Sequence, residues 1–509
     1  MSGALARLPD LLAAHVLLSA AALLLGLLIS LPLAVAASRR PALARAALGL
    51  ASLVQTIPAL ALLALFYPVL IALSGLVGGG IPALGFLPAL LALTLYAVLP
   101  ILRNAVTGLI GLDPALTEAA DGVGMTAGQK LRLVQAPLAA PVAMAGIRTA
   151  AVWTIGAATL ATTVGQPCLG DLIFAGLQTQ DWTLVLTGCI ASALLALITD
   201  ALLGLVETGI RRRRALLAWI GVALIALGIG AATLPALTAA PVTQKTVVIG
   251  AKNFSEQFIL ARLIGLRLER AGYTVRYREG LGSAVIFRAL AAGDIGIYVD
   301  YSGTLWTNEM KRRDVPPRAV MLAQLTGWAE RQGIGMPGAL GFENAYAIAV
   351  RGADARRLKL ETLDDLVRVA PNMVLGGDLE FLERPEWAAL KRAYPLRFRA
   401  TRAFSPTFMY RALESGQADA ISAFSSDGRI ASMQLKILAD PRGAVPGYDA
   451  VMLVSPQKAK DPALMAALAP LAAKIPVDLM REANYRVDRD ADKQSPQDVA
   501  RWLDGRIGR

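Results

Sequence analysis

Four consecutive arginines followed by a long uncharged apolar run constrain this chain more than any other feature. Arg211–Arg214 precede the run Ala215–Ala240, which contains no charged residue. About 20 apolar residues suffice to cross a bilayer, so the run predicts a membrane-spanning helix. Positively charged segments stay on the cytoplasmic side of a membrane. Everything after Pro241, where charged residues return, is therefore expected on the opposite side.

The average composition fits a chain that is part membrane protein and part water-soluble protein. Of the 509 residues, 55% are hydrophobic. The mean hydropathy of +0.52 is too high for a soluble enzyme and too low for a chain that lies wholly in a membrane. The net charge of +12 comes from dispersed cationic residues, with no basic tract interleaved with aromatic residues. We therefore expect no nucleic-acid partner.

The scarcity of cysteine and histidine excludes several kinds of chemistry. Cys168 and Cys189 both belong to the membrane half, which leaves the soluble half without a disulfide or a thiol metal site. The single histidine, His15, lies in an apolar segment and is expected to serve packing. A lone histidine supports neither a metal centre nor a catalytic triad. We expect no metal and no cofactor.

Six apolar segments are long enough to cross a membrane. Their expected ranges are Leu11–Ala37, Leu48–Leu73 (with Pro58 inside it), Phe86–Leu102, Leu138–Val164, Thr183–Ile210 and Ala215–Leu237. The first, third and fifth loops carry arginine or lysine, whereas the second (Ser74–Gly85) and the fourth (Gly165–Trp182) carry none. This alternation predicts six crossings of a bacterial cytoplasmic membrane, with the amino terminus outside.

The third loop, residues 113–137, has a pattern of its own. A helix of small residues is expected first, then a break at Gly124, and then a short amphipathic piece from Lys130 to Leu133. Such a surface can dock into a cleft of a cytoplasmic partner. The alternative is an ordinary polar loop.

This loop resembles the EAA loop of importer-type ABC permeases, whose pattern is Glu-Ala-Ala, three residues, Gly, nine residues and an Ile-x-Leu-Pro ending. The matching residues are Glu118, Ala119, Ala120, Gly124 and Pro137, and the ending departs at Val134 and Ala136. The resemblance implies that the loop inserts into an ATPase subunit and transmits its motion. The chain has no Gly-x-x-x-x-Gly-Lys-Ser/Thr phosphate loop, so the ATPase is expected to be a separate subunit.

Strands and helices alternate in the soluble half. The expected strands are Thr246–Gly250, Tyr273–Tyr277, Ile295–Val299, Ala345–Val350, Met373–Gly376, a short one at Phe398, and Ala420–Phe424. This alternation favours an α/β fold with largely parallel sheets. The 245–509 segment is too long for one small lobe, so we expect two lobes with a cleft between them.

The soluble half resembles the osmoprotectant type of substrate-binding domain, which takes glycine betaine, choline or carnitine. The resemblance covers nearly all of residues 245–509. It rests on the blocks GAKNFSEQ (250–257), LGS (281–283), YVDYSGT (298–304) and FSSDGR (424–429). The family's third block is more often YPEYTGT, from which Val299, Asp300 and Ser302 depart. Related fused chains are reported for ergothioneine-like betaines, so the ligand stays open.

Candidate binding residues lie at strand ends and in these blocks. A quaternary ammonium cannot donate hydrogen bonds and is held by aromatic faces, each worth about 0.5 to 2 kcal/mol. The candidate faces are Phe254, Tyr301, Tyr346 and Phe424. Donors for a ligand carboxylate are Asn253, Gln257, Ser283, Thr304 and the helix start near Ser255. Candidates to complement the cation are Glu256, Asp300 and Asp427.

Core packing is the alternative for each candidate aromatic residue. Trp306, Tyr410 and Tyr448 are assigned to the core at this stage.

These features predict an all-α membrane permease domain followed by a two-lobed α/β domain of the periplasmic-binding-protein type. The permease domain is placed at residues 1–214 with five membrane helices, the sixth membrane helix and a linker at 215–240, and the outer binding domain at 241–509. The expected function is the permease and substrate-binding subunit of an ATP-driven importer for quaternary ammonium osmoprotectants or related betaines. A homodimer with an ATPase partner is the expected assembly.

Two other classes of function compete with the importer. A membrane receptor or a ligand-gated pore with an outer solute-binding domain is the alternative, although neither needs a loop that docks an ATPase. A membrane-anchored enzyme is disfavoured, because the soluble half has no histidine, no cysteine and no paired nucleophile motif.

Overall fold

The computed structural model describes residues 7–78, 80–178, 181–238, 245–489 and 492–508. The chain divides into two compact units, Met1–Ile173 with Thr183–Pro241, and Phe174–Trp182 with Val242–Arg509. We call the first the helical unit and the second the two-lobed unit. The predicted linker at residues 239–240 and the predicted domain boundary at 241 lie outside the described residues.

Among its described residues, the helical unit has six helices that are long and apolar enough to cross a membrane, which confirms the predicted number. These six are α2 (Leu8–Ser38), α4 (Ala59–Leu76), α5 (Phe86–Ile110), α8 (Ala136–Ala158), α10 (Trp182–Arg211) and α11 (Ala215–Thr238). The 16-residue helix α3 (Pro41–Thr56) is not among them. Shorter helical segments are α6 (Pro114–Gly122), α7 (Ala127–Lys130), η1 (Leu131–Gln135), η2 (Thr159–Val164) and α9 (Gly170–Gln178).

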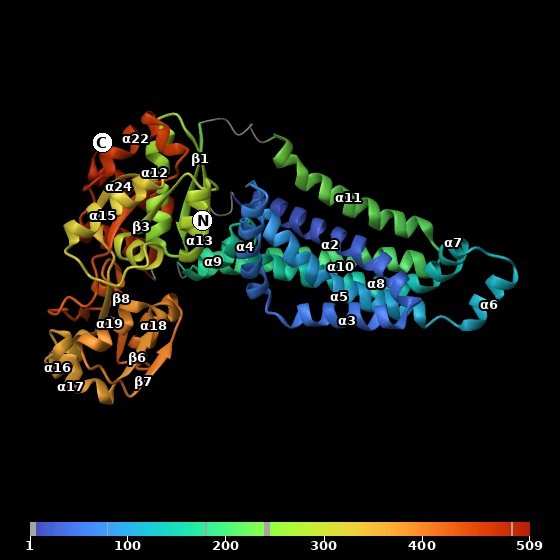
Figure 1. The fold of residues 1–509 in the computed structure, drawn as a ribbon, viewed down its shortest axis with the longest axis horizontal. Coiled ribbons are helices and arrows are strands. Elements are labelled where there is room, and N and C mark those ends of the chain that lie inside the picture. The colour runs from blue at the N-terminus through green and yellow to red at the C-terminus, as the bar shows by residue number, and fades with distance from the viewer. Residues whose placement is uncertain (1–6, 79, 179–180, 239–244, 490–491, 509) are drawn as a thin grey trace. The chain divides into compact units, whose positions relative to one another are not determined.

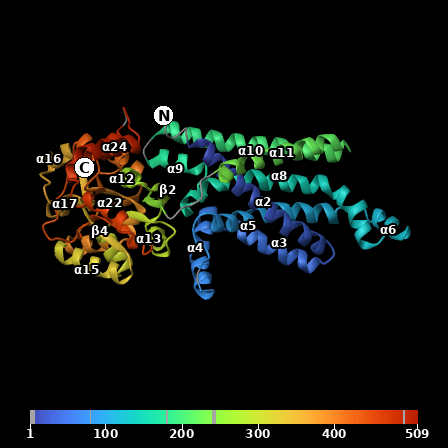
Figure 2. The ribbon, with the colours of Figure 1, turned by 90° about the horizontal axis from the view of Figure 1, so that it is seen from above.

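The prediction of one helix over Leu48–Leu73 was wrong. Helix α3 ends at Thr56 and α4 begins at Ala59. Ile57 between them is extended, with φ −74° and ψ 125°. The ring of Pro58 disfavours the helical conformation for the residue before it, and Pro58 also has no N–H to donate into a helix. Pro58 therefore separates two helices, and Figure 2 shows α4 standing across the direction of the other helices.

Small residues allow the central helices α2, α5 and α8 to pack closely, and these helices run side by side in Figure 1. Gly146 of α8 lies against the α5 backbone, so that a Cβ there would be 2.5 Å from the carbonyl oxygen of Pro100. His15 of α2 is buried, with Nε2 3.0 Å from the Ile155 carbonyl oxygen and Nδ1 accepting from the Leu169 amide at 3.3 Å. Both ring nitrogens of His15 thus serve packing, as predicted.

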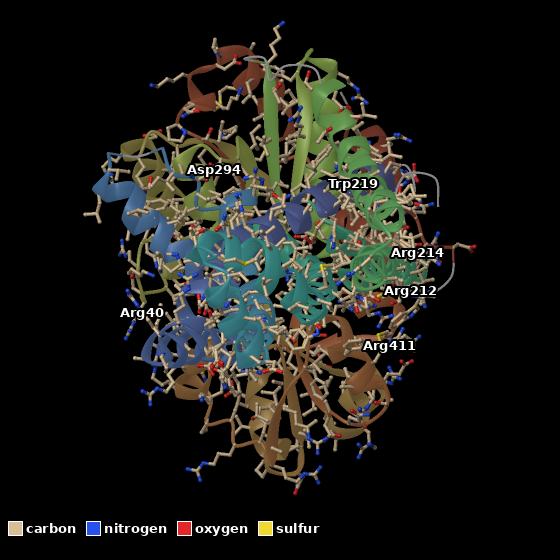
Figure 3. The ribbon with its side chains drawn as sticks, turned by 90° about the vertical axis from the view of Figure 1, so that its right-hand side faces the viewer. Arg40, Arg212, Arg214, Trp219, Asp294 and Arg411 are labelled. Atoms are coloured by element: carbon tan, nitrogen blue, oxygen red, sulfur yellow. The ribbon has the colours of Figure 1, made fainter. Side chains whose placement is uncertain are left out.

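The loop at residues 113–137 forms two helices and a break, as the sequence predicted. Helix α6 is capped by the Asp113 carboxylate and is followed by Gly124, whose φ of +76° is a left-handed conformation that suits glycine. Helix α7 leads through the π-helical turn η1 directly into α8. Figure 3 faces the α6 end of the unit, and Arg40, Arg212 and Arg214 lie around the outline in this view.

The two-lobed unit has ten strands and surrounding helices among its described residues. The strands are β1 (Thr246–Lys252), β2 (Thr274–Leu281), β3 (Ile297–Tyr301), β4 (Gly335–Glu343), β5 (Tyr346–Arg351), β6 (Val374–Gly377), β7 (Ala400–Ala403), β8 (Ala420–Phe424), β9 (Leu435–Ile437) and β10 (Asp449–Val454). The helices are α12 (Ser255–Arg270), α13 (Ser283–Ala292), α14 (Ser302–Thr304), η3 (Leu305–Glu309), α15 (Arg318–Arg331), α16 (Gly352–Leu358), α17 (Leu363–Val369), η4 (Ala370–Asn372), α18 (Leu379–Glu383), α19 (Pro385–Ala393), α20 (Pro406–Glu414), α21 (Arg429–Ser432), η5 (Lys458–Lys460), α22 (Pro462–Leu468), η6 (Ala469–Leu471), α23 (Val477–Asp488) and α24 (Pro496–Ile507).

The strands form one five-stranded sheet in each lobe. The first lobe has the order β2-β1-β3-β10-β4 and the second has the order β7-β6-β8-β5-β9. The chain passes from the first sheet to the second between β4 and β5, and it returns between β9 and β10. The predicted two lobes are therefore present, and two short segments connect them.

The sheets are mixed, so the prediction of largely parallel sheets was wrong. Strands β1 and β6 pair in parallel with their neighbours, whereas β10 and β5 pair antiparallel with theirs. The antiparallel strands are those that follow a passage between the lobes, and such a passage imposes no right-handed helical crossover. The strand predicted at Phe398 lies at Ala400–Ala403 instead.

We expect Gly146→Ala to destabilise the helical unit by about 1–3 kcal/mol, because the added methyl group meets backbone atoms that cannot move aside. Thermal unfolding of the full chain in detergent would measure this loss. Gly156→Ala in the same helix is the matched control, since a Cβ there has nothing within 4 Å. Equal melting temperatures for the two variants would contradict the packing described here.

Candidate ligand-binding site

The two-lobed unit contains a cavity of about 120 Å³ beside the two connecting segments. Its walls come from the carboxyl ends of the parallel strands β1, β3, β6 and β8, and from helix α23. In α/β sheets this strand edge is the usual place for a ligand. The lining residues are Lys252, Asn253, Phe254, Ser255, Glu256, Ser283, Tyr301, Thr304, Asn344, Tyr346, Asp378, Arg384, Phe424, Ser426, Asp427, Arg429, Tyr448, Asn484 and Asp488.

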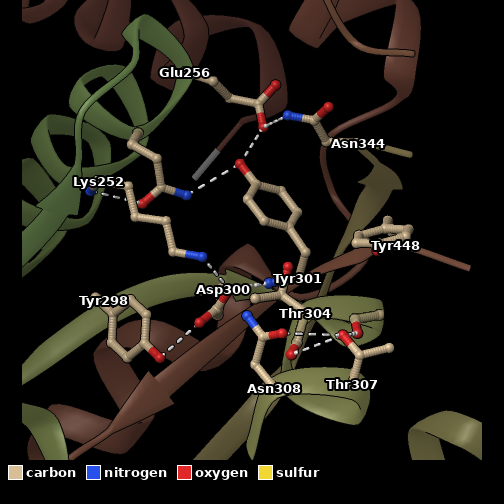
Figure 4. A network of polar contacts seen from close by, with 12 residues as sticks. Lys252, Glu256, Tyr298, Asp300, Tyr301, Thr304, Thr307, Asn308, Asn344 and Tyr448 are labelled. Carbon is tan, nitrogen blue, oxygen red and sulfur yellow. Dashed lines mark hydrogen bonds and ion pairs between the residues drawn. The ribbon is translucent and has the colours of Figure 1, made fainter. Parts of the chain in front are cut away.

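Glu256, in the first turn of α12, is a cavity residue held only by neutral donors among the described residues. One carboxylate oxygen accepts from Tyr301 Oη at 2.5 Å and Asn344 Nδ2 at 3.1 Å. The other accepts from Ser426 Oγ at 2.6 Å and Asn484 Nδ2 at 2.9 Å. The residue is only 2% exposed, and this burial raises the pKa of Glu256. Figure 4 shows its contacts with Tyr301 and Asn344.

Asp300 and Gln257, two of the predicted ligand-binding residues, do not line the cavity. The Asp300 carboxylate is buried against Lys252 Nζ at 2.5 Å and also accepts from Tyr298 Oη at 2.7 Å, as Figure 4 shows. A buried charge needs such compensation, and Asp300 therefore neutralises a lysine. The side-chain amide of Gln257 donates to Tyr301 Oη at 3.0 Å and so supports the aromatic wall from behind.

The remaining predicted residues all line the cavity: Asn253, Phe254, Glu256, Ser283, Tyr301, Thr304, Tyr346, Phe424 and Asp427. Among them are the four predicted aromatic rings. The rings of Phe254 and Tyr301 stack with their centroids 6.2 Å apart, and the ring centroids of Tyr346 and Phe424 are 5.1 Å apart. Tyr448 is buried in the core, as predicted, but it also lines the cavity and meets Tyr346 edge to face with the ring centroids 5.7 Å apart. The cavity is therefore walled by five aromatic rings.

Two arginines also line the cavity, and neither was predicted from the sequence; the guanidinium group of Arg384 lies over the ring of Tyr346, 5.3 Å from its centroid. Arg384 Nε and Nη2 each lie 3.2 Å from a carboxylate oxygen of Glu386, and Arg384 also donates to Tyr448 Oη at 3.3 Å. Arg429 forms a two-pronged ion pair with Asp427, at 3.0 and 2.6 Å. Asp427 is thereby neutralised, although it lines the cavity as predicted. Guanidinium groups are suited to carboxylate recognition.

Some of the other lining residues that were not predicted could have been found from the sequence, and others could not. Lys252 and Ser426 lie inside the GAKNFSEQ and FSSDGR blocks, and Arg429 ends the second of these, so the blocks were a usable signal. Asn344 and Tyr448 lie on the connecting segments, and Asn484 lies on α23, far along the chain. A search at the carboxyl ends of parallel strands does not find residues that follow no parallel strand.

The model of the "Substrate binding domain of ABC-type glycine betaine transport system" matches residues 245–504, just over half of the chain. The chain belongs to this family. A second model, the "Binding-protein-dependent transport system inner membrane component", matches residues 22–212. The protein is thus a fusion of an ABC-importer permease with a binding domain of the glycine betaine family, as the two resemblances in the sequence implied.

Similar proteins include both fused and separate permeases. The ergothioneine transport permease/ergothioneine binding protein EgtU of Helicobacter pylori is 29% identical over 89% of this chain and 82% of its own length. The glycine betaine/carnitine/choline transport system permease protein OpuCB of Bacillus subtilis is 42% identical over 38% of this chain and 83% of its own length. A solved glycine betaine/carnitine/choline ABC transporter structure is 28% identical, with a TM-score of 0.45, over 50% of this chain and 97% of its own.

Asp488, at the end of α23, is a further carboxylate of the cavity wall whose pKa is raised. Its carboxylate accepts from Ser255 Oγ at 2.5 Å. Burial raises the pKa of Asp488 to about 6, although the nearby Arg429 acts to lower it. Because the folded state holds this proton more tightly than the unfolded chain does, the contribution of Asp488 to stability is lost as pH rises through 6.

We expect Asp488→Asn to become more stable relative to the wild type as pH rises from 4 to 7. Chemical unfolding of residues 245–509 at several pH values would measure the difference. Asp478→Asn on the same helix is the control, since its side chain is 88% exposed. If both variants follow the wild-type pH profile in parallel, Asp488 has no raised pKa.

Proposed function

We propose that the two-lobed unit binds a methylated ammonium compound that also carries a carboxylate, and that the helical unit passes it across the membrane. The observation that supports this best is the way Glu256 is held. A carboxylate has about four acceptor positions, and four neutral donors occupy them here. A primary amine would find no free acceptor on Glu256, whereas a methylated ammonium needs none and is still attracted to the charge.

The aromatic rings and the arginines of the cavity suit the two ends of such a ligand. Phe254, Tyr301, Tyr346, Phe424 and Tyr448 offer aromatic faces to the ammonium group. Arg384 and Arg429 place positive charge in the cavity wall that attracts a ligand carboxylate, although both are paired with acidic residues. The backbone amides at the start of α12, near Ser255, are additional donors.

The names of the relatives narrow the solute class. One similar protein is named for ergothioneine, and others are named for glycine betaine, carnitine or choline. Three of these compounds combine a trimethylated ammonium with a carboxylate, which is the chemistry that we propose for this cavity. We infer that the solute of this chain belongs to the same class of betaines.

We propose the topology and assembly that follow from the charge pattern. The division into residues 1–214, 215–240 and 241–509, with the binding domain outside the cytoplasm, is supported by the cationic first, third and fifth loops. The loop at 113–137 docks a separate ATPase, and two copies of the chain form the importer. Support for the docking comes from Glu118, Ala119 and Gly124, which are exposed on α6 and the turn after it, and from Leu133, which is 65% exposed. Ala120 is buried, and Pro137 is the second residue of α8.

We expect Phe424→Leu to weaken binding of a trimethylammonium solute about tenfold, because leucine keeps the apolar volume but offers no aromatic face. Calorimetry on residues 245–509 with carnitine, glycine betaine, choline and ergothioneine would measure this. A neutral compound with a tert-butyl group in place of the ammonium group should lose much less affinity.

Phe408→Leu provides the control for this experiment, because Phe408 is 43% exposed and does not line the cavity. Equal losses for the charged solute and the neutral analogue would show that Phe424 acts only by packing. If the wild-type domain binds none of the four solutes, the proposed ligand class is wrong.

We expect Glu118→Ala to reduce ligand-stimulated ATP hydrolysis in the assembled complex without changing solute affinity, since the residue is exposed and belongs to the helical unit. ATPase assays in proteoliposomes, with the partner subunit titrated, would detect the loss. Asp10→Ala, an exposed carboxylate in the first turn of α2, should leave the activity unchanged. The proposed dock is refuted if Glu118→Ala behaves like Asp10→Ala.

A further inference from the structure

The turn between α10 and α11 carries four arginines, Arg211–Arg214, which we call the arginine turn. All four are exposed, and none of their side chains forms a hydrogen bond or an ion pair with another residue that the structure describes. Figure 3 labels Arg212 and Arg214 on this hairpin. A cluster of charges of one sign attracts an anionic partner.

The backbone holds the arginine turn in one conformation. The φ of Arg213, +52°, lies in the left-handed region that few residues other than glycine adopt. The Arg214 amide donates to the Gly209 carbonyl at 2.9 Å. A Cβ at Gly209 would lie 2.5 Å from the Ala218 nitrogen, so α10 and α11 touch directly beside the turn. Backbone strain of this kind is typical of functional sites.

Deeper in the helical unit, α2, α8, α10 and α11 surround an apolar cavity of about 280 Å³. Its lining consists of alanine, valine, leucine, isoleucine and glycine, with only two hydroxyl side chains, Ser19 and Thr199. Apolar cavities stay free of water, and an unfilled cavity forfeits the van der Waals contacts of its lining. The cavity therefore favours an apolar occupant.

An exposed apolar track on α11 leads from this cavity to the arginine turn. Leu216, Ile220 and Leu224 follow each other at a spacing of four residues, which places them on one face of the helix. All three are exposed, and Leu224 also lines the cavity. Trp219, which is exposed beside this track, belongs to the residue type that marks the boundary between hydrocarbon and head groups.

The distance between the arginine turn and the cavity fits one acyl chain. Leu203, the cavity residue of α10 nearest the turn, precedes Arg211 by 8 positions, which is about 12 Å along the helix. Leu224 follows Arg214 by 10 positions, which is about 15 Å. One leaflet supplies half of a hydrocarbon core that is about 30 Å thick. A chain that hangs from a head group at the arginine turn therefore ends inside the cavity.

Two other occupants fit these features less well. A second copy that met this face symmetrically would bring a second arginine turn close to the first, and the like charges would repel each other. A water-soluble subunit can pair with the arginines, but it does not reach a cavity at this depth in the hydrocarbon.

We propose that the arginine turn and the cavity together bind one anionic phospholipid of the cytoplasmic leaflet. Its phosphate lies among Arg211–Arg214, one acyl chain follows the exposed face of α11, and the end of that chain fills the cavity. The inference rests on the proposed topology, which places the arginine turn at the cytoplasmic surface. The bound lipid fastens α11, the last helix before the two-lobed unit, to α2, α8 and α10.

A photoactivatable lipid tests the site on the full chain. The chain is reconstituted in phosphatidylcholine nanodiscs with a trace of phosphatidylglycerol that carries a diazirine at the end of one acyl chain. After illumination, peptide mass spectrometry should find the label on α11 around Gly228 and on α10 around Leu203. A phosphatidylcholine with the same diazirine should label these positions at least about tenfold less, because it lacks the net negative charge.

A pair of glycine variants tests the cavity. Gly228→Trp fills it, and Gly230→Trp on the same helix is the matched control. A Cβ at either glycine meets nothing within 4 Å, but only Gly228 lines the cavity. Gly228→Trp should abolish the labelling by phosphatidylglycerol, whereas Gly230→Trp should keep it. Equal labelling of the two variants shows that the acyl chain does not enter the cavity.

A pair of double variants tests the charges. Arg212→Gln with Arg214→Gln removes half of the charge of the arginine turn and should reduce the labelling by about tenfold or more. Arg45→Gln with Arg132→Gln removes two exposed arginines elsewhere in the helical unit and should leave the labelling unchanged.

The comparison of the two lipids on the unaltered chain decides the proposal even where a variant fails to fold. Equal labelling by phosphatidylglycerol and phosphatidylcholine overturns the anionic head group, and a label that misses α10 and α11 overturns the site. None of these measurements involves a solute or an ATPase. A failure of the importer function would therefore appear separately, in the calorimetry and the ATPase assays.

Discussion

The two-lobed unit depends on the hydrogen bonds that compensate one buried carboxylate, that of Glu256. Glu256 accepts hydrogen bonds from Tyr301 at the end of β3, Asn344 on a connecting segment, Ser426 after β8 and Asn484 on α23. These donors belong to both lobes and to the chain between them. An unpaired buried charge is costly, so every donor that leaves raises the free energy of the folded state. The charge therefore holds both lobes around the cavity.

In the helical unit, carboxylates are compensated by an arginine and not by neutral donors. Arg148 compensates Asp200 and Glu207, but all three side chains remain partly open in the single chain. In the two-lobed unit the buried pairs Lys252–Asp300 and Arg384–Glu386 are closed by surrounding protein. The ion pairs of the two-lobed unit are thus enclosed by protein, whereas those of the helical unit are partly exposed.

The sequence was sufficient for the parts of the fold that depend on local patterns. Hydropathy and loop charge predicted the six spans, and the 113–137 pattern predicted the α6–α7 break at Gly124. The apolar run is continuous through Pro58, and this continuity led to the prediction of a single helix. In the structure the extended backbone of Ile57, the residue before Pro58, ends α3. The mixed sheets were missed because β5 and β10 acquire their direction from long-range passages between lobes.

The residues of the candidate site also fall into two groups: those that local sequence patterns predict and those that only the tertiary fold brings to the cavity. Nine of the eleven predicted ligand-binding residues line the cavity, because strand ends and sequence blocks are local signals. Asp300 could not be told apart from Glu256 in the sequence, since only the fold brings Lys252 to the former and neutral donors to the latter. Arg384, Asn344 and Asn484 reach the cavity by tertiary packing, which no periodicity records.

The turn η1 joins α7 to α8 without a break, so the backbone runs as one helix from Ala127 to Ala158. A displacement applied at the first turn of this helical rod is carried toward its far end, and the rod bends most readily at the π-helical turn η1 and at Pro141. Arg148 lies on this rod, some 20 residues from the start. The helix therefore links the loop at residues 113–137 mechanically to Arg148, so that a movement of the loop displaces the arginine.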